Sequence, residues 1–149
     1  MRKEPHFEWD ENLGQATCII EDSQQRVFFG LATCHGDDMD MKSRRTGEEI
    51  AFRRARMDYL RQQRDDILLE LKALKQLYYS MNQSKRFNPK SYENTMLQRQ
   101  IRIKTFDLDT IKEMLASERE SLKNLIDEKD KFYKQVRAYR NKAKNLQES

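Results

Sequence analysis

Apolar residues change their spacing along the chain near residue 47. Before that point, two short segments rich in β-branched and aromatic residues, QATCIIE (15–21) and RVFFGLAT (26–33), flank the polar sequence DSQQ. Four polar residues between two such segments are typical of a turn that joins antiparallel strands. We therefore predict a β-hairpin. We expect HFEW (6–9) to add a third strand, because an isolated two-stranded hairpin is marginally stable in water.

The register of this hairpin predicts which of its faces is buried. If Glu21 pairs with Arg26, Cys18 lies opposite Phe29, and one face collects six apolar residues. These six are Ala16, Cys18, Ile20, Val27, Phe29 and Leu31. In this register Cys34 lies about 16 Å along the strand from Phe29 and points to the face opposite Cys18. A disulfide or a zinc ion shared by the two cysteines is then excluded.

From Ile50 onward, apolar residues recur at heptad spacing, which predicts a long helix. Its a and d positions are Ile50, Arg53, Met57, Leu60, Arg64, Ile67, Leu71, Leu74, Tyr78 and Met81. Thr46 and Glu49 match the S/T-x-x-E pattern of a capping box, so we expect the helix to begin at Thr46. The turn residues of 83–90 end it, and Ser91 is a suitable cap for a second helix. The predicted helices cover 46–82 and 91–147.

The second helix carries the most regular pattern in the chain. With Ile101 at a and Leu97 at d, twelve of its fifteen a and d positions are apolar. The exceptions, Lys104, Glu118 and Lys129, are polar residues that can fix register or pairing. Ten apolar positions form a candidate oligomer seam: Leu97, Ile101, Leu108, Ile111, Leu115, Leu122, Leu125, Phe132, Val136 and Tyr139.

A short connection containing Pro89 predicts that the two helices form an antiparallel hairpin. At about 1.5 Å per residue, the second helix is about 30 Å longer than the first. Its last part, with Phe132, Tyr133, Val136 and Tyr139, therefore either covers the apolar face of the head or packs against another chain. Because two helices share only a thin core, we expect a homodimer or higher homo-oligomer, with a self-contained hairpin as the alternative.

Composition supports a mainly α fold with a small N-terminal β head. Only 37% of the 149 residues are hydrophobic and 36% are charged, which suits long amphipathic helices better than a thick core. All four glycines and Pro5 lie in the first 47 residues. We assign 1–45 to the head with its acidic loop and 46–149 to the helical hairpin. With no membrane-spanning or signal-peptide pattern, we expect no membrane association and a cytoplasmic protein.

The loop after the head combines Cys34 and His35 with several acids, but its spacing matches no metal motif. There is no CxxC or HxxxH pair, and the apparent calcium loop beginning at Asp38 has Lys42 and Ser43 at required positions. The chain also lacks phosphate-loop and nucleophile motifs, and neighbouring strand residues such as Cys34 and His35 point to opposite faces. We therefore expect no metal, no cofactor and no catalytic residues, hence no enzyme.

Positive charge gathers near the C-terminus. Seven basic residues stand against Asp130 alone between 129 and 144: Lys129, Lys131, Lys134, Arg137, Arg140, Lys142 and Lys144. A basic helix can follow nucleic-acid phosphates, which makes nucleic-acid binding an alternative function. Basic residues also suit the C-terminal end of a helix dipole and the solvated face of a coiled coil.

The head and the start of the first helix resemble a pattern in small phage and prophage proteins. The pattern is a short hairpin, F-x-G-x-A-x-C-H, spaced Asp residues and S-x-x-x-G-x-x-I-A-x-x-R-A before a charged coiled coil. The matching positions are Phe28, Gly30, Ala32, Cys34, His35, Asp38, Asp40, Ser43, Gly47, Ile50, Ala51, Arg54 and Ala55. The resemblance covers about a third of the chain. It implies a phage accessory protein in the host cytoplasm that binds a host protein, for example as an inhibitor of a defence nuclease.

These observations favour a non-enzymatic protein that acts by protein–protein binding. The candidate partner-binding residues adjoin the helix start: His35, Asp37, Asp38, Asp40, Arg44, Arg45, Arg53 and Arg54. The alternatives are a nucleic-acid-binding or architectural protein that uses the basic helix and a structural scaffold protein that forms large assemblies. Salt separates the first two classes, because phosphate binding weakens steeply as salt rises.

Overall fold

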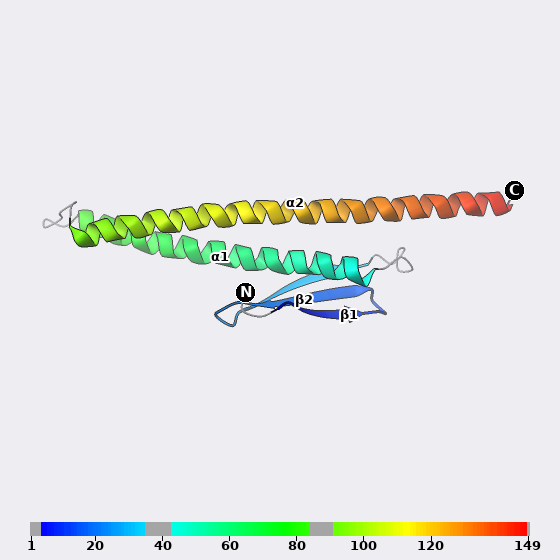
Figure 1. The fold of residues 1–149 in the computed structure, drawn as a ribbon, viewed down its shortest axis with the longest axis horizontal. Helices are drawn as coiled ribbons and strands as arrows, with labels where there is room; N and C mark the ends of the chain where they lie inside the picture. Colours follow the sequence, from blue (N-terminus) through cyan, green and yellow to red (C-terminus); the bar gives the residue numbers. More distant parts are fainter. Residues whose placement is uncertain (1–3, 35–42, 84–90, 149) are drawn as a thin grey trace. The chain divides into compact units, whose positions relative to one another are not determined.

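The fold was obtained as a computed structural model (Figure 1), which describes residues 4–34, 43–83 and 91–148. Three strands, β1 (His6–Asp10), β2 (Gln15–Glu21) and β3 (Val27–Thr33), precede two long helices, α1 (Arg44–Asn82) and α2 (Tyr92–Glu148). The predicted mainly α fold with a small N-terminal sheet is thus confirmed. The contacts divide the chain into two compact units, residues 1–59 with 117–149 and residues 60–116.

The three strands form one antiparallel sheet in the order β1-β2-β3, so the expected third strand is present. The predicted hairpin register, however, is wrong by one residue. Glu21 pairs with Val27 instead of Arg26, and Cys18 pairs with Gly30 instead of Phe29. A one-residue shift moves every side chain of the strand to the other face.

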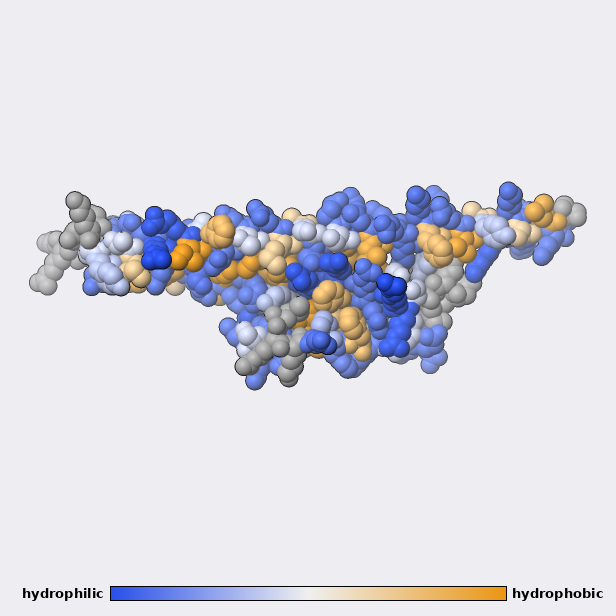
Figure 2. Space-filling view, in the orientation of Figure 1, coloured by the Kyte–Doolittle hydropathy of each residue, from blue (hydrophilic) through white to orange (hydrophobic). Residues whose placement is uncertain are grey.

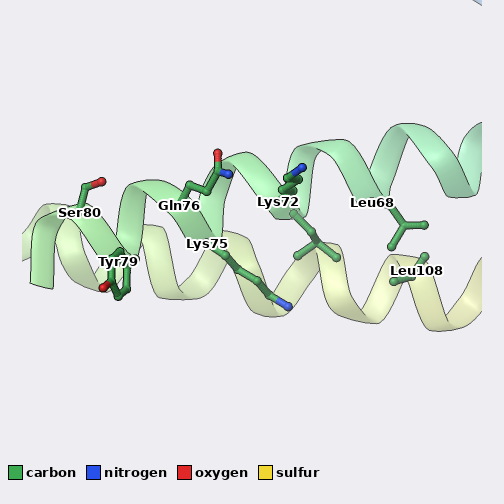
Figure 3. Close-up of a pocket in the computed structure, with 8 residues that line it drawn as sticks. Leu68, Lys72, Lys75, Gln76, Tyr79, Ser80 and Leu108 are labelled. Carbon is green, nitrogen blue, oxygen red and sulfur yellow. The ribbon is translucent and has the colours of Figure 1, made fainter.

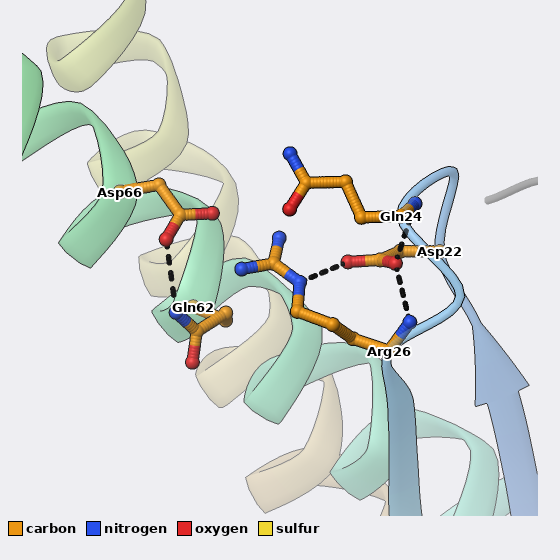
Figure 4. Close-up of polar contacts among 5 residues, drawn as sticks. All are labelled: Asp22, Gln24, Arg26, Gln62 and Asp66. Carbon is orange, nitrogen blue, oxygen red and sulfur yellow. Dashed lines mark hydrogen bonds and ion pairs between the residues drawn. The ribbon is translucent and has the colours of Figure 1, made fainter.

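The shift has its cause in the turn (Figure 4), which contains the five residues 22–26 because Glu21 pairs with Val27. The Asp22 N–H donates to the Arg26 carbonyl at 3.0 Å, and Gln25 adopts a left-handed φ of 64°. The buried Asp22 carboxylate accepts the backbone N–H groups of Gln24 and Arg26 at 2.9 Å and the Arg26 Nε–H at 2.7 Å. Burial alone would raise the pKa of Asp22, but the hydrogen bonds from Arg26 and Gln24 lower it below its usual value. The side chain of Asp22 therefore selects the longer turn.

With this register, the two faces of the sheet differ from the prediction. The inner face, which packs on α1, carries Ala16, Cys18, Ile20, Phe28, Gly30 and Ala32. The outer face carries Val27, Phe29 and Leu31, which are 47%, 58% and 46% exposed. The predicted orientation of Cys34 relative to Cys18 rested on the old register and is withdrawn with it. Neither cysteine is part of a disulfide.

Small residues allow the first turns of α1 to lie directly against β3. A Cβ atom added to Gly30 would lie 1.8 Å from the Ala51 carbonyl oxygen and 2.5 Å from the Ala55 nitrogen. Around this contact, Ile20 and Ile50 form a buried core with the alanines of both elements. Hydrophobic burial and close backbone packing thus join the sheet to the helix.

The C-terminal half of α2 completes the core of this unit. Leu122, Leu125 and Ile126 pack against the cluster that includes Ala16 and Ile50. Tyr133 is only 6% exposed. The last part of the second helix was expected either to cover the head or to pack against another chain. As far as Tyr133, it covers the head. From residue 137 to 148, every residue is exposed.

The helix starts use serine caps. The Ser43 Oγ accepts the Thr46 N–H at 3.3 Å, and the Ser43 carbonyl accepts the Gly47 N–H at 2.9 Å. The predicted capping box at Thr46 is therefore wrong, because Ser43 is the cap and α1 begins at Arg44. The prediction for α2 is confirmed, since the Ser91 Oγ accepts the Asn94 N–H at 3.2 Å.

Residues 60–116 form an antiparallel helical pair, as the heptads predict. Ile67 and Leu71 of α1 pack against Leu108 of α2, with Ile101 and Ile111 beside them. Farther along the same pair, the Gln98 Nε2 lies 3.3 Å from the Tyr78 hydroxyl oxygen. Within the described part of the chain, neither helix combines the length and apolarity needed to cross a bilayer.

Candidate partner-binding groove

An open groove lies beside the start of α1, where this helix meets the C-terminal half of α2. Its volume is about 480 Å³. It is lined by Ser43, Thr46, Leu125, Glu128, Lys129, Phe132 and Tyr133. The groove therefore brings together the predicted partner-binding region and the first residue of the predicted basic surface.

Both sides of the groove are held in place by neighbouring structure. The Ser43 cap fixes the first turn of α1, and Leu125 packs into the core of the head. Lys129 lies over the Tyr133 ring, with its Nζ 5.6 Å from the ring centroid. Phe132 stays 55% exposed, with its ring centroid 6.0 Å from that of Tyr133. An aromatic side chain is thus presented on a fixed helix.

Two predicted arginines lie at the surface close to this groove. Arg44 donates from Nε to the Glu48 Oε1 at 2.9 Å, an ion pair in which the Arg44 side chain is 62% exposed. Arg45 is also exposed. Both directly precede Thr46, which lines the groove, and the charge of Arg44 is paired with that of Glu48.

The other two arginines of that prediction contribute to the fold itself. Arg53 donates from Nη1 to both carboxylate oxygens of Glu118 at 3.1 Å, and Arg54 donates to the Leu31 carbonyl at 2.6 Å. Arg53 therefore joins α1 to α2, whereas Arg54 joins α1 to β3. The remaining predicted residues, His35, Asp37, Asp38 and Asp40, lie outside the described residues.

The predicted basic surface follows α2 beyond the groove. Lys129 is half-buried and contributes to the groove lining. The other six are exposed: Lys131, Lys134, Arg137, Arg140, Lys142 and Lys144. Figure 2 shows hydrophobic side chains in orange between hydrophilic ones in blue toward this end of the helix. The end of α2 is therefore basic and amphipathic.

The predicted oligomer seam is used largely within the chain. Leu97, Leu108 and Leu115 are buried, and Ile101, Ile111, Leu122, Leu125 and Val136 are half-buried. Phe132 and Tyr139 are 55% and 75% exposed. The apolar positions left for another chain thus concentrate near the C-terminal end of α2.

The cysteines differ in their chemistry. Burial, reinforced by the negative charge of Glu48, raises the pKa of the Cys18 thiol to about 11. Cys18 therefore stays protonated at neutral pH and is a poor nucleophile. Cys34 is only half-buried and lines a small cavity of about 20 Å³ together with Tyr133 and Lys129.

Among residues 4–34, 43–83 and 91–148, no three His, Cys, Asp or Glu side chains are grouped to hold a metal ion.

A second groove, of about 730 Å³, lies along the helices in residues 60–116 (Figure 3). Its apolar part includes Leu68 and Leu71 of α1 and Leu108 of α2, and Lys72 and Lys75 add positive charge. Tyr79 at one end is 66% exposed. Apart from Leu108 of the predicted oligomer seam, this groove has no counterpart among the predicted site residues, because the heptad pattern emphasises buried positions and Leu68 and Tyr79 lie outside a and d.

Comparisons of the chain with protein-family models, curated proteins and solved structures found no match. The chemistry of the grooves and exposed faces is therefore the basis on which a function can be proposed.

Proposed function

We propose that the protein is a non-catalytic binding protein that occupies a surface of a protein partner through the groove at the start of α1. The observation that supports this most directly is the exposed Phe132 ring in a groove whose lining residue Thr46 directly follows Arg44 and Arg45 in α1. An aromatic anchor with arginines nearby is the composition that dominates binding energy in protein interfaces. The partner segment that fits is one with an apolar residue for the groove and an acidic residue for its rim.

The rigidity of the groove favours binding, because little order has to be created when a partner docks. On one side of the groove Ser43 caps the first turn of α1, and on the other side Tyr133 of α2 is buried. A pre-formed surface avoids part of the entropic cost of association. The resemblance to phage accessory proteins suggests a host protein as the partner, with inhibition of a host factor such as a defence nuclease as the consequence.

Nucleic-acid binding is the second candidate, and the exposed basic residues of α2 favour it. Six of the seven predicted basic positions are exposed, which gives a helix that can approach phosphates. A large scaffold assembly remains a third proposal. Light scattering separates it from the other two by its mass.

The test is capture of a partner by tagged protein from nuclease-treated bacterial lysate. Wild type should recover one protein in stoichiometric amount, and a Phe132→Ala/Arg45→Glu variant should recover at least about tenfold less, because a hot-spot side chain contributes 2 kcal/mol or more. Phe106→Ala is the matched control, since Phe106 is a 71% exposed α2 residue far along the sequence from the groove.

Equal recovery by the groove variant and wild type would contradict the proposal. If neither recovers a protein and wild type instead retards duplex or single-stranded nucleic acid at low salt, the basic helix is the functional surface. Retardation should then weaken steeply as salt is raised. Far-UV circular dichroism of each variant checks that helix content is unchanged.

A further inference from the structure

The outer face of the sheet and the end of α2 are two uncovered apolar surfaces with opposite charge. On the outer face, Val27, Phe29 and Leu31 stand in one row along β3, and each is about half exposed. The half-buried Ile19 of β2 pairs with Phe29 and widens this row. A contiguous apolar patch of this kind on one sheet face marks an interaction surface.

The charges on the outer face are acidic. Glu8 and Asp10 of β1 lie on the outer face, because they pair with Thr17 and Gln15 of β2. Glu21 pairs with Val27 at the other end of the row. The apolar row is thus bordered by three carboxylates, and the Arg54 guanidinium donates to the Leu31 carbonyl at the edge of β3.

The end of α2 has the complementary character. Val136, Tyr139, Ala143 and Leu146 recur at a and d spacing, and Tyr139 and Leu146 are 75% and 70% exposed. Six basic residues and only one acidic residue lie between 131 and 148. On a helical wheel, Arg140 and Lys142 flank the apolar stripe on its two sides.

The two surfaces also match in length. From Val136 to Leu146 the helix rises about 15 Å at 1.5 Å per residue. From Val27 to Leu31 the strand spans about 13 Å at 3.3 Å per residue. The stripe can therefore cover the apolar row while its basic flanks reach the acidic border.

Within one chain, this contact cannot form. Leu122, Leu125 and Ile126 hold α2 on the core that the inner face shares with α1. From there to Glu148 the helix contains neither glycine nor proline and continues without a break. Its end therefore cannot turn back around the sheet to reach the outer face.

Pairing of two α2 ends with each other is disfavoured by their charge. At the e and g positions beside the stripe stand Arg140 and Lys142, which would face like charges in a coiled coil of two copies. The occupant of the stripe must instead carry acidic residues around an apolar row. The outer face of the sheet in a second copy of this chain has both.

We propose that the chain self-associates by docking the α2 end of one copy on the outer sheet face of another, reciprocally in a two-fold dimer. The contact uses Tyr139 and Leu146 on one side and Phe29 and Leu31 on the other. It shares no residue with the groove at the start of α1, so it goes beyond the proposed function, and partner binding can fail or succeed independently of it. Two equivalent contacts close the pair, as two-fold symmetry requires.

The first test is the mass in solution, measured by light scattering over a range of concentrations. Wild type should have twice the mass of the 18.0 kDa chain. A sheet variant, Phe29→Thr/Leu31→Thr, and a helix variant, Tyr139→Glu/Leu146→Glu, should both be monomeric. The matched control, Leu69→Glu/Phe106→Glu, changes side chains that are 68% and 71% exposed in residues 60–116 and should remain dimeric.

A monomeric wild type at every concentration overturns the proposal. So does a sheet variant that stays dimeric while the helix variant dissociates, since that pattern indicates pairing of α2 with α2. Equal dissociation of the control overturns it as well, because the contact would then lie elsewhere.

A second measurement locates the contact directly. A spin label is attached at position 142 of a Lys142→Cys/Cys34→Ser chain, in which the remaining Cys18 is fully buried and does not take the label. Mixed with an isotope-labelled, unmodified chain, it should broaden the amide signals of Glu8, Thr17 and Leu31 in the second copy. Broadening confined to α2 signals of the second copy would refute the docking.

Discussion

At the scale of single residues, Gly30 sets the distance between the sheet and α1. Its missing side chain lets the backbone of Ala51 and Ala55 approach β3 more closely than any other residue would allow. The sequence shows a glycine within a β-rich segment, and such a glycine can mark a close backbone approach. The element that approaches it becomes known only from the fold.

We expect Gly30→Ala to lower the free energy of unfolding by at least about 3 kcal/mol, because the added carbon meets backbone atoms that cannot rotate away. Chemical denaturation measures the loss. Gly47→Ala is the control, since its added carbon would lie 3.2 Å from the Ala16 Cβ and alanine favours the helix by about 1 kcal/mol. Losses of equal size at both positions would contradict the role given to Gly30.

The two thiols should differ in reactivity. With a pKa of about 11 and no exposure, Cys18 should resist a thiol reagent in the folded protein, whereas Cys34 should react. In the unfolded chain the thiol of Cys18 returns to its ordinary pKa. Its contribution to stability is therefore present below that pKa and is lost as pH rises toward 11.

Titration with a chromogenic disulfide checks this at neutral pH. One thiol should react in the native state and two in denaturant. A Cys34→Ser chain that still reacts rapidly when folded would show that Cys18 is accessible.

At the scale of elements, polar residues at heptad positions make specific contacts between the helices. Glu118 at a d position is 7% exposed and pairs with Arg53, at another d position, and with Arg56. In residues 60–116, Lys104 lies 2.6 Å from Glu70, and this hydrogen bond raises the pKa of Lys104. The heptad pattern identified Lys104 and Glu118 as register-fixing positions. The residues that pair with Lys104 and Glu118 could be identified only once the pairing of the helices was known.

Glu118→Ala should lower stability by about 1–3 kcal/mol, because it leaves two guanidinium groups partly desolvated without their carboxylate. The expected loss of stability is smaller than for a fully buried ion pair, since the two arginine side chains are still about one-third exposed. Glu70→Ala is the comparison and should cost less than about 1 kcal/mol, because Glu70 is 51% exposed. A double-mutant cycle of Glu118 with Arg53 measures the coupling, and additivity of the two changes would contradict the contact.

At the scale of the whole molecule, periodicity gave the architecture and most element boundaries, since heptads and strand-forming segments are local signals. The faces of the sheet were assigned wrongly, because the extra turn residue depends on hydrogen bonds of the Asp22 side chain that no hydrophobic pattern records. The groove was only partly anticipated. Lys129 and Phe132 were singled out for charge and for the heptad seam, but their proximity to Ser43 arises from tertiary packing.

The core of the head joins residues that lie about a hundred positions apart in the sequence, such as Ala16 and Leu122. Contacts of such high sequence separation slow folding, because a long loop has to close before they form. A chain growing on the ribosome exposes the three strands about a hundred residues before the α2 residues that finish their cover are synthesised. The apolar inner face of the sheet therefore stays incompletely covered while these roughly one hundred residues are translated, a period in which aggregation or a chaperone competes with native folding.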